Sequence, residues 1–134
     1  FILRRRMKTN PLKQAHYALL PYCTGDLHAG NTKITYRKGR TIYHHGHANM
    51  IAYLKRLVPT FSKVKRVILA GVSAGGVGAS LHWQRVQHAF GPKVRVDLLN
   101  DGGAPLNPLP PRWQTWRKRW QLQLLILRNG KHAA

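Results

Sequence analysis

One segment constrains the fold of this chain more than any other: an apolar run that leads directly into a glycine-rich turn and then into a helical pattern. Residues 67–72 (VILAGV) carry no polar side chain, which is typical of a parallel strand covered on both faces. A Gly-Val-Ser-Ala-Gly sequence occupies 71–75, and Gly-Pro at 91–92 ends the pattern that follows it. That pattern places apolar side chains on one helical face, namely Ala79, Trp83, Val86 and Phe90. The segment therefore predicts a strand, a tight turn and a helix over 76–90.

Strands and helices are predicted to alternate on both sides of this segment. Short strands are expected at 15–22 (AHYALLPY), at 40–45 and at 94–98, where apolar and charged residues alternate. A helix is expected over 47–58, because Pro59 should weaken or end it there. Its apolar face comprises Met50, Leu54, Leu57 and Phe61. This alternation predicts an α/β protein, with three layers and a mostly parallel sheet.

A last helix is predicted over 113–127. One face of it carries Trp113, Trp116, Trp120, Leu124 and Leu127. Basic amphipathic helices with tryptophan bind membrane surfaces, and a stripe of this kind also packs into a protein core. The residue pattern alone leaves both interpretations open.

Length and composition bound the class of protein. A chain of 134 residues supports at most one domain, since domains commonly have about 100–150 residues. Its 43% hydrophobic content excludes a wholly disordered basic tail, and no apolar run reaches the roughly 18 residues of an integral membrane segment. The single cysteine, Cys23, excludes an internal disulfide framework and a cysteine-based zinc site. We expect a basic tail or entering loop over 1–14 and one domain over 15–134.

The charge balance is extreme, with 23 Lys and Arg against 3 Asp and Glu, a formal charge of +20. The basic residues are spread along the chain instead of forming a tail. Such a charge suits a polyanionic partner, either nucleic acid or acidic polysaccharide, and it equally suits a solvated basic face. A non-catalytic module that binds polyanions is therefore one of the functions the sequence allows.

The turn at 71–75 carries the strongest chemical signal, because Gly-x-Ser-x-Gly between a strand and a helix is the pattern of a nucleophile elbow. In such an elbow a strained turn projects the serine hydroxyl, here that of Ser73, above the edge of the sheet. The helix that follows points its free N–H groups at a developing oxyanion, and Ala74 would supply one of them. The alternative is a glycine-rich turn without a catalytic role, such as a phosphate-binding loop, although no Gly-Lys-Ser/Thr follows it.

A serine nucleophile needs a histidine base and an acid that orients it, and in this fold they follow the serine in the chain. Downstream of Ser73 the acids are Asp97 and Asp101. Asp101 follows a predicted strand and is expected to face the site. The downstream histidines are His82 and His88, on the helix that leaves the elbow, and His132, the third residue from the end of the chain. The sequence therefore predicts an incomplete triad.

The His-His-Gly-His sequence at 44–47 raises the question of a metal, since imidazoles suit zinc and other transition metals. No carboxylate or thiol lies nearby in the sequence, and the spacing matches no familiar site. We expect a loop at the end of a strand that caps the next helix, with no metal and no cofactor.

Four motifs occur in an order that is characteristic of one family. They are PYCTGDLHAG at 21–30, GHAN at 46–49, GVSAGG at 71–76 and DGG at 101–103. Together they resemble the pectin acetylesterase family, which also includes the animal Wnt deacylase Notum. The motifs of the bacterial branch are the most similar in sequence. The resemblance covers most of the chain, from residue 15 to residue 120.

The resemblance implies a secreted or periplasmic serine carboxylesterase of α/β-hydrolase type. Such an enzyme removes O-acyl groups from acetylated polysaccharide or from small acyl esters, without metal or organic cofactor. Ser73 matches the family's nucleophile and Ala74 its oxyanion donor, while Tyr22 and Asp26 belong to a segment similar to one that lines the approach to the site. Asp101 matches a family position that is not the triad acid.

Three departures from the family pattern are visible. A Gly-Gly-Trp segment that precedes the tyrosine-cysteine motif in relatives is absent, the family's catalytic Asp and His would lie beyond the Asp-Gly-Gly loop, and Cys23 has no partner. The chain begins at Phe1 without a signal peptide. These features lead us to expect the middle of a larger esterase that is a poor catalyst by itself, and the family's similar tryptophans favour core packing of 113–127.

Overall fold

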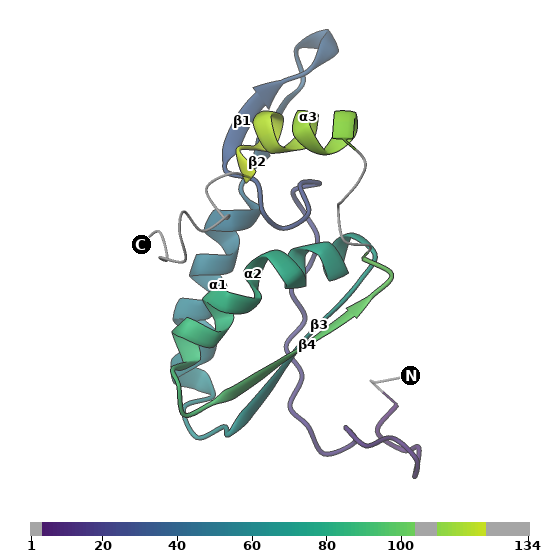
Figure 1. The fold of residues 1–134 in the computed structure, drawn as a ribbon, viewed down its shortest axis with the longest axis vertical. Helices are drawn as coiled ribbons and strands as arrows, with labels where there is room; N and C mark the ends of the chain where they lie inside the picture. The colour runs from purple at the N-terminus through teal and green to yellow at the C-terminus, as the bar shows by residue number, and fades with distance from the viewer. Residues whose placement is uncertain (1–3, 104–109, 123–134) are drawn as a thin grey trace.

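The computed structural model describes residues 4–103 and 110–122, and helices alternate with strands from residue 32 onward (Figure 1). The protein is of the α/β class. In chain order the elements are β1 (Thr32–Thr35), the 3-10 helix η1 (Arg37–Gly39), β2 (Thr41–His44), α1 (Gly46–Thr60), β3 (Arg66–Val72), α2 (Ala74–Phe90), β4 (Arg95–Asp101) and α3 (Pro110–Trp120).

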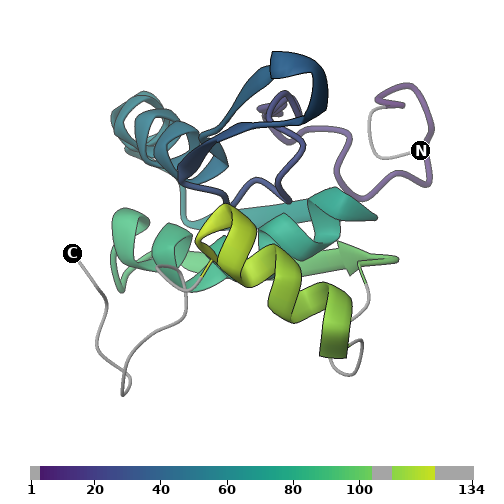
Figure 2. The same ribbon diagram turned by 90° about the horizontal axis from the view of Figure 1, so that it is seen from above.

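The centre of the fold is a parallel pair of strands, β3 and β4, in register from Arg66 opposite Arg95 to Val72 opposite Asp101. Helix α2 lies along one face of this pair and α1 packs beside α2 (Figures 1 and 2). The core between them comprises Met50, Leu54, Val86 and Val96, with Val67 and Leu69 packed against it. On the opposite face Ala70, Val72 and Leu99 are exposed. Within the described part of the chain, the predicted mostly parallel sheet is this one pair.

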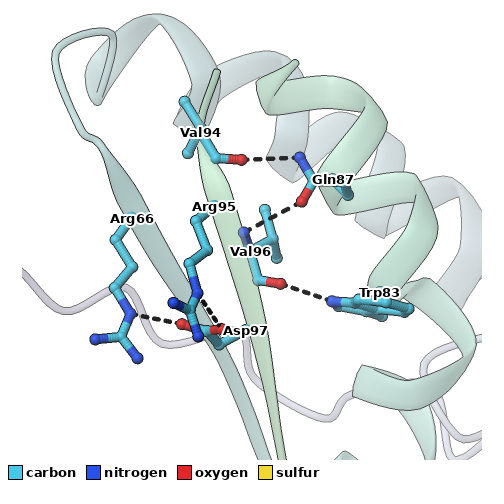
Figure 3. Close-up of polar contacts among 7 residues, drawn as sticks. All are labelled: Arg66, Trp83, Gln87, Val94, Arg95, Val96 and Asp97. Carbon is cyan, nitrogen blue, oxygen red and sulfur yellow. Dashed lines mark hydrogen bonds and ion pairs between the residues drawn. The ribbon is translucent and has the colours of Figure 1, made fainter. Parts of the chain in front are cut away.

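The first half of β4 is covered at its outer edge by side chains of α2 (Figure 3). The Gln87 amide donates to the Val94 carbonyl at 2.8 Å and accepts from the Val96 N–H at 3.2 Å. The Trp83 indole N–H donates to the Val96 carbonyl at 2.9 Å. Backbone groups that β3 does not pair are thereby satisfied, which protects an edge that would otherwise be free to bind another strand.

The same end of the pair holds an ionic cluster on the face away from α2 (Figure 3). Asp97 accepts from the Nε of Arg66 at 2.5 Å and from the Nε of Arg95 at 2.8 Å. These two guanidinium hydrogen bonds, that of Arg95 first, lower the pKa of the Asp97 carboxyl. The site is open to solvent, so the cluster contributes mainly local order.

A second sheet is formed by β1 and β2, which pair antiparallel from Thr32 opposite His44 to Thr35 opposite Thr41. The strand predicted at 40–45 is thus confirmed as β2, but its partner β1 was not predicted and the pair is separate from β3 and β4. Lys38, in the connection, has a left-handed φ of 64°. Figure 1 shows this hairpin projecting from the body beside α3.

The strand predicted at 15–22 is wrong: that segment has no regular secondary structure. Leu19 exposes 90% of its surface, and no described strand bonds to the segment, so its short apolar run has nothing to pair with. It is anchored instead by single contacts, such as the Tyr17 hydroxyl, which donates to the Leu12 carbonyl at 2.7 Å. Residues 4–14 form successive turns, and the buried Asn10 side chain accepts from the Leu12 N–H at 2.9 Å.

The three predicted helices are confirmed with shifted ends. Helix α1 continues through Pro59 to Thr60, because a proline in the last turn disturbs only the bond to one earlier carbonyl. Helix α2 begins at Ala74, directly after the elbow. Helix α3 covers Pro110–Trp120, and the end of the predicted helix, from 123 to 127, lies outside the described residues.

Trp120, the last residue of α3, lies beside the hairpin. The rings of Trp116 and Trp120 stack at 5.5 Å, and the Trp120 ring lies 5.8 Å from that of His44. The Asn31 N–H donates to the Trp120 carbonyl at 3.0 Å. Among the described helices, none has the length and apolar character needed to cross a membrane.

Candidate active site

Ser73 occupies the turn between β3 and α2 in a strained conformation. Its φ is 53° and its ψ is −119°, a region that costs a non-glycine residue about 1–3 kcal/mol and is found most often at functional sites. Two backbone hydrogen bonds hold it there: its N–H donates to the Asp101 carbonyl at 2.8 Å, and its carbonyl accepts from the Val77 N–H at 3.1 Å. The residue is exposed, so a reactant can reach its hydroxyl.

The glycines that flank Ser73 have different roles. A Cβ on Gly71 would lie 2.1 Å from the Gly75 carbonyl oxygen, whereas a Cβ on Gly75 would meet no atom within 4 Å. A side chain would therefore collide at Gly71 and not at Gly75. The strand can approach the first turn of the helix this closely only because Gly71 has no side chain.

The first turn of α2 provides unoccupied hydrogen-bond donors beside the serine. The N–H groups of Ala74, Gly75 and Gly76 have no acceptor among the described residues, as is usual at the start of a helix. This end of the helix also carries the positive end of its dipole. An anion that forms next to Ser73 would meet donors there, including the N–H of Ala74.

Two predicted site residues are placed together in the loop before β1. Asp26 is fully buried, and its carboxylate accepts from the Thr24 hydroxyl at 2.6 Å and from the N–H groups of Gly30 at 3.0 Å and Gly46 at 2.9 Å. It therefore ties this loop to the start of α1. Tyr22 is partly exposed, and its hydroxyl accepts from the Leu27 N–H at 2.8 Å. Burial is the main cause that raises the pKa of Tyr22.

Behind this loop lies a group of three histidines that sequence reasoning missed. His82 is fully buried, its Nε2 donates to the His28 carbonyl at 2.8 Å, and burial lowers its pKa to about 4. Its ring lies 6.1 Å from that of His47, and burial also lowers the pKa values of His28 and His47. The Nδ1 atoms of His47 and His82 are buried without a hydrogen-bond partner. Because the three residues are far apart in sequence, no local pattern signals the group.

None of these three imidazoles is hydrogen-bonded to Ser73. Among residues 4–103 and 110–122, no hydrogen bond joins the Ser73 hydroxyl to a histidine. His82 is directed at the loop before β1, and His88 lies in the last turn of α2, away from the elbow. His132 lies outside the described residues. Asp101 reaches Ser73 through its backbone carbonyl.

The His-His-Gly-His sequence at 44–47 is used for structure. The Nε2 of His44 is bonded to the Tyr36 hydroxyl and its Nδ1 to the Thr24 carbonyl, both at 2.8 Å. His45 takes the N-cap position of α1 without a side-chain hydrogen bond, so the predicted capping comes from Asp26 instead. In the part of the chain that the structure describes, no three His, Cys, Asp or Glu side chains gather as a metal ion would require.

The carboxyl end of β4 contains a further residue that sequence reasoning missed. The side chain of Asn100 makes hydrogen bonds to both Ser80 and Gly103. An asparagine at the carboxyl end of a strand beside a glycine-rich helix start was the available signal.

The described residues form an α/β protein with a strained, exposed serine at the carboxyl end of a parallel strand, followed by free helix N–H groups. The family model of pectinacetylesterase matches residues 2–124. The chain therefore belongs to the pectinacetylesterase family, and the expectation from the four motifs is confirmed. No curated protein matches the chain, and no solved structure matches it.

Proposed function

We propose that this protein is a serine carboxylesterase that removes O-acetyl groups from acetylated polysaccharide or from small acyl esters. The observation that carries the proposal is the conformation of Ser73, which is exposed and held at a positive φ at the start of α2. Membership of the pectinacetylesterase family supplies the class of reaction, hydrolysis of an acetyl ester. A secreted or periplasmic location is part of the proposal.

In the proposed reaction the Ser73 Oγ attacks the acetyl carbonyl carbon while a base takes the hydroxyl proton. The Ala74 N–H stabilises the oxyanion of the tetrahedral intermediate. Collapse of that intermediate expels the sugar hydroxyl, which receives the proton, and leaves acetyl on the serine. Water then hydrolyses the acyl-enzyme by the same steps in reverse order. We propose that the base, its acid partner and further oxyanion donors come from residues beyond the described part of the chain.

A larger α/β-hydrolase-like fold would also explain the bare face of the sheet. Parallel strands are normally covered on both sides, yet Val72 exposes 70% of its surface and Leu99 46% on the face away from α2. We propose that residues 15–134 are part of a larger domain, and that further layers of this domain cover the face. In this proposal residues 1–14 are an entering segment.

The distribution of charge favours a second candidate, a non-catalytic module that binds polyanions. Of the acids, Asp26 is buried and Asp97 is held by two arginines. The basic side chains of the hairpin connection are exposed and form no ion pair with an acid in the described part of the chain, namely Arg37, Lys38 and Arg40. An uncompensated charge of this kind attracts nucleic acid or acidic polysaccharide.

Covalent labelling distinguishes the two candidates. We expect a fluorophosphonate probe to modify Ser73, as located by peptide mass spectrometry, and no modification of the Ser73→Ala variant. A wild-type chain that folds but stays unlabelled, and that binds a polyanion more weakly as salt rises, would replace the esterase proposal with the binding module.

A further inference from the structure

The amide of Asn100 links the end of β4 to the first turns of α2. Its Nδ2 donates to the Ser80 Oγ at 2.9 Å and to the Gly103 carbonyl at 2.7 Å, while its Oδ1 accepts from the Gly103 N–H at 2.8 Å. Ser80 in turn donates to the Gly76 carbonyl at 3.0 Å. One continuous chain of hydrogen bonds therefore runs from the turn after β4 to the helix that starts at the elbow.

The surroundings of this amide leave no room for other side chains. A Cβ on Gly76 would lie 2.2 Å from the Asn100 Oδ1, and a Cβ on Gly103 would lie 2.5 Å from the same atom and 2.6 Å from the Val77 nitrogen. The two glycines thus allow the turn to close directly on the helix. The close fit shows that the position of the turn relative to α2 is specified by these contacts.

The same end of β4 holds the strained serine. The residue after Asn100 is Asp101, which pairs with Val72 of β3 and whose carbonyl accepts the Ser73 N–H at 2.8 Å. That bond opposes relaxation of Ser73 from its φ of 53°, and the contacts of Asn100 hold this end of β4 against α2. Asn100 is exposed and does not itself contact the Ser73 hydroxyl.

We infer that Asn100 is a positioning residue for the proposed nucleophile: its amide docks the carboxyl end of β4 on α2, and the Asp101 carbonyl at that end fixes the orientation of Ser73. The inference rests on the proposed function. A purely structural role would give a different pattern, because loss of these hydrogen bonds would then lower stability without changing the rate at which the folded protein reacts at Ser73.

The test compares two amide clamps at opposite ends of β4. In the full chain we expect Asn100→Ala to lower the rate constant for fluorophosphonate reaction within the bound complex about 10- to 100-fold, as small misplacements of reacting groups do. The probe concentration at half-maximal rate should stay within a factor of about two, since the probe's binding surface is intact. Gln87→Ala, which removes the other amide clamp, should leave both values near those of the wild type.

A second measurement tests the hydrogen bonds of the Asn100 clamp without any reaction at Ser73. We expect the N–H of Ser73 to exchange with deuterium faster in Asn100→Ala than in the wild type, and Gln87→Ala to leave that exchange unchanged. If Asn100→Ala fails to unfold cooperatively, Ser80→Ala replaces it, because this variant breaks only the link between the amide and the helix.

The outcomes separate the two proposals. A wild-type chain that is unlabelled at Ser73 overturns the proposed function, and the exchange of the Ser73 N–H still decides whether the clamp exists. Labelling of the wild type with an unchanged reaction rate in the variant that lacks the clamp overturns the role of Asn100. Unchanged exchange of the Ser73 N–H in that variant overturns it as well.

Discussion

Side-chain amides hold both ends of β4, but the consequences for the backbone differ. At the end near residue 94, the Gln87 amide and the Trp83 indole satisfy an exposed strand edge. At the end near residue 101, the Asn100 amide docks a turn whose neighbouring carbonyl holds a serine at positive φ. The contacts at the first end protect an exposed strand edge, and the contacts at the second end maintain a strained residue. Side-chain amides that bond to backbone therefore have to be judged by what the restrained backbone does.

The largest effect is expected at the strained end, in the esterase activity of the 134-residue chain. A serine hydrolase without its triad partners keeps about 10³–10⁴-fold acceleration from the oxyanion hole and binding, and the proposal assigns only the Ala74 N–H, among the free N–H groups at the start of α2, to that hole. We expect slow hydrolysis of a small aryl acetate and its complete loss in Ser73→Ala. Turnover at about 1 s⁻¹ or faster is an ordinary enzymatic rate. Such a rate would show that the chain contains its own base.

The second effect concerns pH and the loop that packs on α2. Since burial lowers the pKa of His82 from 6.5 to about 4, the unfolded chain binds more protons between these values. Stability is therefore fully present above pH 6.5 and falls as the pH drops toward 4, by about 3 kcal/mol at most. His28 and His47, whose pKa values burial also lowers, act in the same direction.

Urea unfolding at pH 7 and pH 4.5 measures this effect. The control is His82→Gln, which cannot titrate and should lose less stability over the same interval. Equal losses in the two proteins would exclude His82 as the main acid-sensitive group.

The third effect tests the unstrained end of β4. Gln87→Ala leaves the N–H of Val96 and the carbonyl of Val94 without the Gln87 amide, while the Gly91 carbonyl still accepts from the Val94 N–H. Because the site is only partly buried, water replaces some of these bonds, and we expect a loss of about 1–2 kcal/mol in the free energy of unfolding. Chemical denaturation measures it, with labelling of Ser73 as the matched readout. A large loss of labelling together with unchanged stability would reverse the contrast between the two ends.

What the sequence could predict follows from how local each signal is. The strand β3 and the helix α2 are encoded in an apolar run, Gly71 and a helical stripe, and all three were recognised. The strand β1 has the short polar sequence TKIT and depends on its partner β2, while 15–22 has a strand-like pattern but no strand to bond with. A local pattern cannot distinguish these two cases.

The residues of the candidate site also differ in how local their sequence signals are. Ser73 and Ala74 could be proposed from the sequence because their motif is contiguous. The clamp at Asn100 depends on the absence of side chains at Gly76 and Gly103, which come close only in the folded chain. The carboxylate of Asp26 and the ring of His82 likewise have their functions set by partners 20 or more residues away.

The smallest effect is expected from Ser73→Gly, and it has the opposite sign. At a φ of 53° a serine side chain is strained and glycine is not, so the substitution should relieve the strained end of β4. Glycine also gains more freedom in the unfolded chain, which offsets part of the relief. We expect a net gain of about 0.5–1 kcal/mol in the free energy of unfolding, whereas Ser73→Ala keeps the strain and should gain nothing. Parallel urea titrations of the three proteins measure it, and a Gly variant no more stable than the Ala variant would mean that the elbow stores no strain. A gain confined to glycine would show that this protein gives up stability at the one position where its proposed chemistry requires a projecting hydroxyl.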